Sequence, residues 1–133
     1  MSPEAAEVKR WLEKADHDAQ TGKLALAQAP PITDVGAFHA QQAVEKLLKA
    51  YLVYREHPFE KIHDLEELID QCARHDPVFS DFRDRVAPLT AYAVRFRYPG
   101  PADPTVEQVG LALGVVDEVW DFVLGRLPAE VRP

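Results

Sequence analysis

The sequence predicts an all-α protein, built as an up-and-down antiparallel bundle of about five helices. No segment alternates apolar and polar residues as a half-buried strand does, and proline and glycine divide the chain into segments with helical spacing. The connections between these segments are short, which favours antiparallel neighbours. A chain of 133 residues buries one core, so residues 1–133 are expected to form a single helical domain.

The first two helices are expected over residues 3–28 and 34–55. Ser2 is a suitable N-cap for the first, with Pro3 at the first helical position, and "APPIT" ends it. In the second, apolar residues cover more than half of the circumference, whereas a helix that packs on one side has a narrower stripe. The second helix should therefore be central and contact at least two neighbours.

The third and fourth helices follow the loop "EHPFEKIH". Asp64 and Glu67 form a capping-box pattern that starts the third, which ends near "RHDP". The fourth is expected over residues 77–98. Pro88 lies in its middle, so a bend or a break into two pieces is expected there.

The fifth helix is expected over residues 106–127, after a second capping-box pattern at Thr105 and Gln108. It carries apolar residues on two sides. Such a helix is either deeply buried or pairs with another subunit. We expect a homodimer, with the interface on the second apolar stripe, which comprises Leu111, Val115 and Phe122.

Net charge and apolar runs limit the classes of partner. The formal charge of −7 argues against non-specific nucleic-acid binding as the main activity. A local basic groove remains compatible with it. No apolar run approaches the length of a membrane span, the N-terminus lacks the apolar segment of a signal peptide, and Cys72 is the single cysteine. A cytoplasmic protein without membrane contact is expected.

The usual signatures of catalysis and cofactor binding are absent from the sequence. The five histidines form no metal-ligand motif, and no glycine-rich phosphate loop is present. Cys72 and Ser80 lack the sequence context of a nucleophile. The sequence therefore predicts no metal, no cofactor and no catalytic residue.

One polar stripe invites a functional interpretation. In "FHAQQAVEKLLKAYL", residues 38–52, the side chains of His39, Gln42, Lys46 and Lys49 recur three, four and three positions apart and share one helix face. A solvated face is one interpretation. A ligand surface is the other, because the fourth helix ends in the aromatic and basic segment "RFRYPG". Cations and rings together suit a phosphate joined to a base or sugar, although cations at a helix C-terminus also complement its dipole.

The segments "FHAQQAVEKLLKAYL", "HDLEELI" and "LTAYAVRFRYPG", in this order, resemble the HEPN domain family (higher eukaryotes and prokaryotes nucleotide-binding), of the type partnered with a minimal nucleotidyltransferase. The resemblance runs from Trp11 to about Leu127. It implies a helical bundle that is often dimeric and is encoded beside, or fused to, a nucleotidyltransferase in a toxin–antitoxin-like pair. Similarity of this bundle to the substrate-binding domain of kanamycin nucleotidyltransferase implies binding of a nucleotide or nucleotidyl acceptor.

The resemblance also implies site residues. Carried over by position, the recurring polar residues of the family include Glu45 and Asp64. The residues expected to bind ligand are His39, Gln42, Lys46, Lys49, His63, Tyr92, Arg95, Arg97 and Tyr98. Lys46, Lys49, Arg95 and Arg97 would meet phosphate.

The sequence departs from the ribonucleases of this family, which carry an Arg followed after four to six residues by a His near the start of a late helix. No His follows Arg95 or Arg97, and the similarly spaced Arg10 and His17 belong to the first helix. A binding module is therefore favoured over an enzyme, with RNA a less favoured ligand than a nucleotide. The alternatives are a ribonuclease toxin and a structural, antitoxin-like subunit that binds no ligand.

Overall fold

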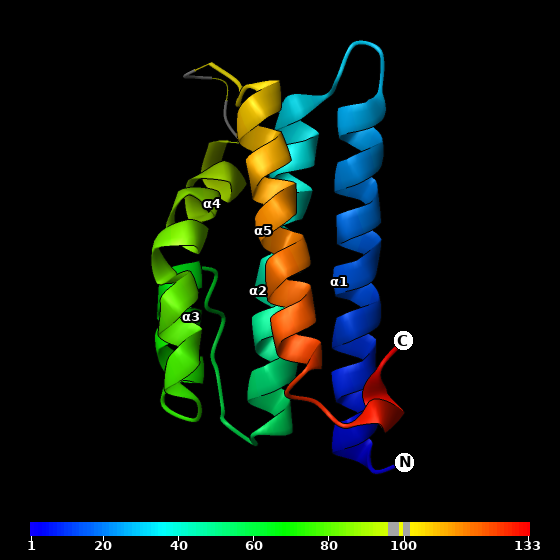
Figure 1. Ribbon diagram of the computed structural model, residues 1–133, viewed down its shortest axis with the longest axis vertical. Helices are drawn as coiled ribbons and strands as arrows, with labels where there is room; N and C mark the ends of the chain where they lie inside the picture. Colours follow the sequence, from blue (N-terminus) through cyan, green and yellow to red (C-terminus); the bar gives the residue numbers. More distant parts are fainter. Residues whose placement is uncertain (96–98, 100–101) are drawn as a thin grey trace.

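The computed structural model describes residues 1–95, 99 and 102–133, with the side chains of residues 94 and 95 outside that description (Figure 1). The described chain contains five α-helices and two short 3-10 helices, and no strand occurs within these ranges. The all-α prediction is confirmed. The elements are α1 (Pro3–Ala27), α2 (Thr33–Tyr54), α3 (Leu65–Ala73), η1 (Pro77–Phe82), α4 (Arg83–Arg95), α5 (Val106–Leu124) and η2 (Ala129–Val131).

The helix starts follow local chemistry. Ser2 Oγ accepts from the backbone N–H of Ala5 at 3.0 Å, and the Asp64 carboxylate accepts from the first turn of α3. Thr105 and Gln108 form a reciprocal capping box at α5. These contacts satisfy N–H groups that have no partner inside the helix. The three predicted N-caps are confirmed.

The break in the fourth helical segment lies elsewhere than predicted. The segment divides between Phe82 and Arg83, whereas α4 continues through Pro88. Asp76 caps η1 by accepting from the backbone N–H of Val78 at 3.1 Å, which starts a separate short helix. Pro88 removes one intrahelical hydrogen bond, and its ring lies at a groove beside α5. A break at Pro88 is therefore wrong, because the chain divides about one and a half turns earlier, whereas a bend at Pro88 stays a prediction.

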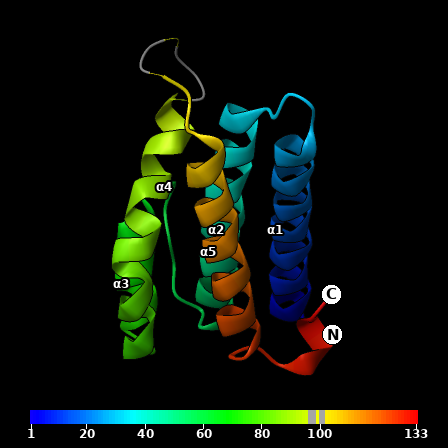
Figure 2. The same cartoon turned by 45° about the horizontal axis from the view of Figure 1, so that its top comes forward.

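The second helix is central, as its wide apolar surface predicts. It packs against α1, α3, α4 and α5. Figures 1 and 2 show α1 on one flank of the pair formed by α2 and α5, and α3 and α4 on the opposite flank. After α2, a loop runs back along the bundle to reach the start of α3 (Figure 1). This arrangement places the polar residues of α2 between α1 and that loop.

Two glycines allow α1, α2 and α5 to approach closely. A Cβ atom at Gly22 would lie 2.9 Å from a methyl group of Leu113, and one at Gly36 would lie 2.9 Å from a methyl group of Val109. Both distances are shorter than van der Waals contact, so a larger residue at either position would require its neighbours to shift. The contact of α1 with α2 and α5 thus depends on the absence of side chains at two positions.

Candidate functional site

The polar stripe of α2 is held by a buried carboxylate on α1. Asp18 is 8% exposed, and its two oxygens contact His39 Nδ1 at 2.8 Å and the ammonium group of Lys46. Two donors therefore converge on one acidic side chain in the contact between α1 and α2. An ionised carboxylate accepts hydrogen bonds and donates none, so His39 carries its proton on Nδ1.

A second buried carboxylate, Glu45, organises the other edge of the stripe. It is 4% exposed and receives three donors: Gln41 Nε2 at 3.3 Å, Lys49 Nζ at 3.3 Å and His63 Nδ1 at 3.1 Å. Gln42 Nε2 in turn donates to Gln41 Oε1 at 2.6 Å. These contacts join α2 to the loop that precedes α3, and they form a continuous polar network inside a helical protein.

Lys49 is the most deeply placed cation of the stripe. Its side chain is 7% exposed, and its ammonium group lies 5.7 Å from the ring centroid of Trp11 and 5.5 Å from that of Phe59. Aromatic faces attract a cation, and the two rings also shield it from water. Lys49 therefore contacts Glu45 within α2, Trp11 of α1 and Phe59 of the loop after α2.

The solvated-face interpretation does not describe this stripe. Its four side chains have partners in α1, in α2 itself or in the loop before α3, and the two carboxylates cancel the charges of Lys46 and Lys49. Sequence reasoning missed Asp18 altogether. A signal existed, because Asp18 shares the buried face of α1 with Ala15, Ala19 and Gly22. A charged residue on an apolar stripe implies a partner on the facing helix.

The structure brings part of the predicted site together. His39, Gln42, Lys46 and Lys49 lie on the polar face of α2, and His63 joins them through Glu45. Tyr92 lies elsewhere, because its side chain lines a groove between α4 and α5. The Arg95 side chain and all of Arg97 and Tyr98 fall outside the described residues.

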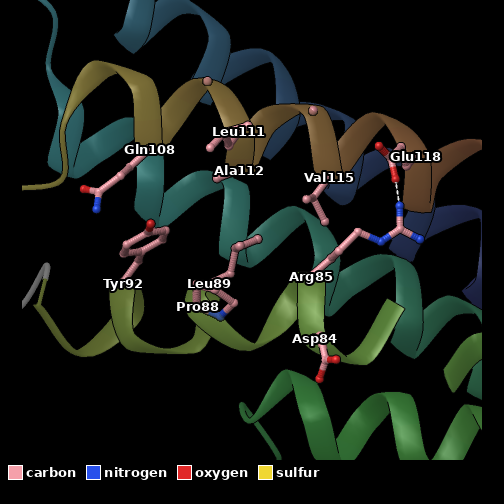
Figure 3. A pocket seen from close by; sticks show the side chains of 12 residues that line it. Asp84, Arg85, Pro88, Leu89, Tyr92, Gln108, Leu111, Ala112, Val115 and Glu118 are labelled. Atoms are coloured by element: carbon pink, nitrogen blue, oxygen red, sulfur yellow. Dashed lines mark hydrogen bonds and ion pairs between the residues drawn. The ribbon is translucent and has the colours of Figure 1, made fainter. Parts of the chain in front are cut away.

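That groove has a volume of about 550 Å³ and mostly apolar walls. Figure 3 shows Leu111 and Val115 of α5 facing Pro88 and Leu89 of α4 across it. One end is bounded by an ion pair between Arg85 and Glu118, and the other by Tyr92 and Gln108 (Figure 3). On α5, Gly110 and Gly114 add no side chain, and a Cβ atom at either would meet nothing within 4 Å.

The predicted dimer stripe on α5 has two different environments. Leu111 is 74% exposed and Val115 lines the groove. Phe122 instead packs within its own chain, with its ring centroid 4.8 Å from that of Phe79 and 4.9 Å from that of Phe82. The two residues nearer the N-terminus of α5 are therefore accessible to another molecule, whereas Phe122 is largely engaged.

Among the described residues, the cysteine and the remaining close pair of histidines form neither a reactive thiol site nor a metal site. Burial raises the pKa of the Cys72 thiol, which keeps it protonated and unreactive. His57 Nδ1 and His75 Nε2 lie 2.8 Å apart. No third ligand accompanies this pair, since the described residues contain no group of three or more His, Cys, Asp or Glu side chains suited to a metal.

No helix in the described ranges has both the length and the apolar character needed to cross a bilayer. No match to the chain is found among the curated proteins or among the solved structures. The family model described as HEPN domain matches residues 8–127, which run from within α1 to beyond the end of α5 and include both buried carboxylates and the groove. The chain belongs to the HEPN domain family.

Proposed function

We propose that this HEPN domain is a non-catalytic binding module for a nucleotide or a nucleotidyl acceptor. It acts with a separate nucleotidyltransferase, in a pair of the toxin–antitoxin kind. HEPN domains often partner with nucleotidyltransferases, which supports the second part of the proposal. The ligand lies on the polar face of α2, where the side chains of His39, Lys46 and His63 reach the surface.

The observation that carries this proposal is the pair of buried carboxylates. Burying an ion pair requires desolvation that its mutual attraction barely offsets, so apolar residues of similar size would stabilise the helix contact as well. Asp18 and Glu45 nevertheless hold five polar side chains in fixed positions. Gln41 and Lys49 are buried, whereas His39, Lys46 and His63 reach the surface. Fixed donors of this kind favour recognition of an anion with defined geometry.

Calorimetric titration of AMP, ATP and inorganic phosphate into the purified protein tests the ligand. We expect heat from the nucleotides, and a loss of binding in Lys46→Ala combined with Arg97→Ala while the helical circular dichroism is retained. Lys23→Ala is the matched control, because Lys23 pairs with Asp117 at the exposed contact of α1 with α5. Absence of nucleotide heat with the unaltered protein would contradict the ligand part of the proposal.

The two alternatives give different results in simple assays. A ribonuclease toxin would cleave tRNA or total RNA, and the cleavage would depend on Arg97 or His63. A structural, antitoxin-like subunit would co-purify with a nucleotidyltransferase through the polar face and show no nucleotide heat. We expect intact RNA, because the Arg and His pair that the chemistry requires is absent from the late part of the sequence.

We also propose that the chain forms a homodimer through the α4–α5 groove. Leu111 projects at the edge of an apolar hollow that lies on the same surface. A two-fold axis beside α5 would place each Leu111 in the groove of the other copy, as a self-complementary interface requires. Gly110 and Gly114 leave room for this approach. Sedimentation of a clean monomer at tens of micromolar would refute the dimer.

A further inference from the structure

His63 differs from the other polar residues of the site in being both oriented and exposed. Its side chain is 67% exposed, whereas the carboxylate of Glu45 that it contacts is almost fully buried. Glu45 also accepts from Lys49 Nζ through its other oxygen, at 3.3 Å. An ionised carboxylate accepts only, so the imidazole donates from Nδ1, and Nε2 belongs to a side chain that is largely exposed.

The backbone around His63 is fixed at three successive residues. Gln41 Nε2 donates to the carbonyl of His63 at 3.3 Å. Asp64 caps α3, and the backbone N–H of Leu65 donates to Thr90 Oγ1 on α4 at 3.1 Å. An exposed loop histidine normally has many orientations, and this one is held by α2, α3 and α4 together. Such positioning is characteristic of a group that meets a ligand.

The net charge of the stripe depends on whether its histidines are protonated. Lys46 is balanced by Asp18, and Lys49 is balanced by Glu45. With His39 and His63 neutral, these six groups sum to zero. Protonation of a histidine adds the positive charge that an anion needs, and imidazole side chains change charge near neutral pH. Nε2 then changes from an acceptor to a donor at the same position.

We propose that His63, oriented by Glu45, is the proton-dependent contact for a phosphate group of the bound nucleotide. This inference rests on the proposed nucleotide-binding function and identifies the group that regulates it. Neutral His63 presents a lone pair, which repels a phosphate oxygen. Protonated His63 donates a charge-assisted hydrogen bond to that oxygen, so binding takes up a proton.

Titration of ATP at pH 5.8 and pH 7.8, in two buffers of different ionisation enthalpy, tests the inference. The unaltered protein should bind ATP about tenfold more tightly at the lower pH than at the higher, and take up protons on binding. In His63→Gln the pH effect should fall to the share that comes from the ATP phosphates and from His39, which both proteins have in common. His17→Gln, at an exposed histidine of α1, should behave like the unaltered protein.

A second measurement tests the role of Glu45 without a ligand. Nitrogen-15 shifts of the His63 ring should report the Nδ1–H tautomer at neutral pH, and Glu45→Gln should abolish this preference. Three outcomes would overturn the inference. If His63→Gln binds ATP with unchanged proton uptake, the nucleotide-binding function is retained but His63 is not the proton-dependent contact. An Nε2–H tautomer in the unaltered protein would contradict the orientation. Absence of ATP binding at both pH values would remove the proposed function and this inference together.

Discussion

The two flanks of α5 show opposite uses of glycine. On the side that faces α1 and α2, methyl groups of α5 lie 2.9 Å from where a Cβ atom of Gly22 or Gly36 would stand. On the α4 side, Gly110 and Gly114 face open space. The first flank is closed, with a buried polar network beyond it on α2, and the second is an open apolar groove. The same residue type thus marks tight packing inside the chain on one flank and an unfilled surface on the other.

The polar flank should be far more sensitive to the loss of a charge than the groove. Glu45→Ala leaves Lys49 buried without its carboxylate, so we expect the free energy of unfolding to fall by about 3–5 kcal/mol. Urea denaturation measures this. Glu118→Ala removes an ion pair with Arg85 at the rim of the groove, where both side chains are about half exposed, and should cost about 0–1 kcal/mol. Equal losses in the two variants would show that the Glu45 network is no more buried than the rim.

The same substitution, glycine to valine, can be compared on the closed flank and in the groove. Gly36→Val forces a side chain against Val109, and we expect a loss of about 2 kcal/mol of unfolding free energy from overpacking. Gly114→Val meets nothing within 4 Å at Cβ and should leave the stability of the monomer within about 0.5 kcal/mol. Thermal unfolding of both variants at a concentration that keeps them monomeric checks this. A destabilised Gly114→Val monomer would mean that the groove is filled by its own chain.

A substitution in the groove should change dimer assembly rather than the stability of the monomer. Leu111→Glu places a charge in the proposed interface, and the dimer dissociation constant should rise at least about tenfold because an unpaired charge would be buried there. Sedimentation velocity over a concentration series measures it. Leu24→Glu, at an exposed leucine of α1, is the control and should not alter assembly. An unchanged dissociation constant in Leu111→Glu would exclude this face as the interface.

The smallest expected effect concerns the closed end of the α4–α5 flank, where Arg126 stacks on Phe122 and contacts Asp76 at 2.6 Å. The hydrogen bond from Arg126 and that from the backbone of Val78 lower the pKa of Asp76 below its ordinary value of 3.8. A carboxyl with a lowered folded pKa contributes stability above the unfolded value, and this is lost as the pH falls through the folded value.

Arg126→Ala should therefore reduce stability at neutral pH and flatten its acid dependence below about pH 4. Guanidinium denaturation between pH 2 and 7 measures this, with Arg74→Ala as a control at the exposed C-cap of α3. An acid limb that is as steep in Arg126→Ala as in the unaltered protein would rule out the Asp76 contact as its source.

Features set by neighbouring residues were predictable from the sequence. The N-caps at Ser2, Asp64 and Thr105 depend on contacts within one helical turn, and the central position of α2 follows from its own apolar surface. The break near Pro88 was misplaced because the cap at Asp76 starts a separate 3-10 helix first.

Features set by helix register were not predictable in the same way. The pairing of Lys46 with Asp18 depends on how far α1 is shifted along α2, which the periodicity of either helix leaves open. The location of Tyr92 in the groove depends on the rotation of α4 against α5. The spacing on α2 correctly placed four side chains on one face, and the facing helix determined that this face is largely covered.

The location of nucleotide binding tests the central claim most directly. ATP added to nitrogen-15-labelled protein at pH 5.8 should shift the amide signals of α1 and α2 around Asp18 and Glu45, together with those of His63, and leave the groove residues Leu111 and Val115 unchanged. Shifts confined to the groove, or no shifts at millimolar ATP, would contradict the assignment of the polar face of α2 as the ligand site.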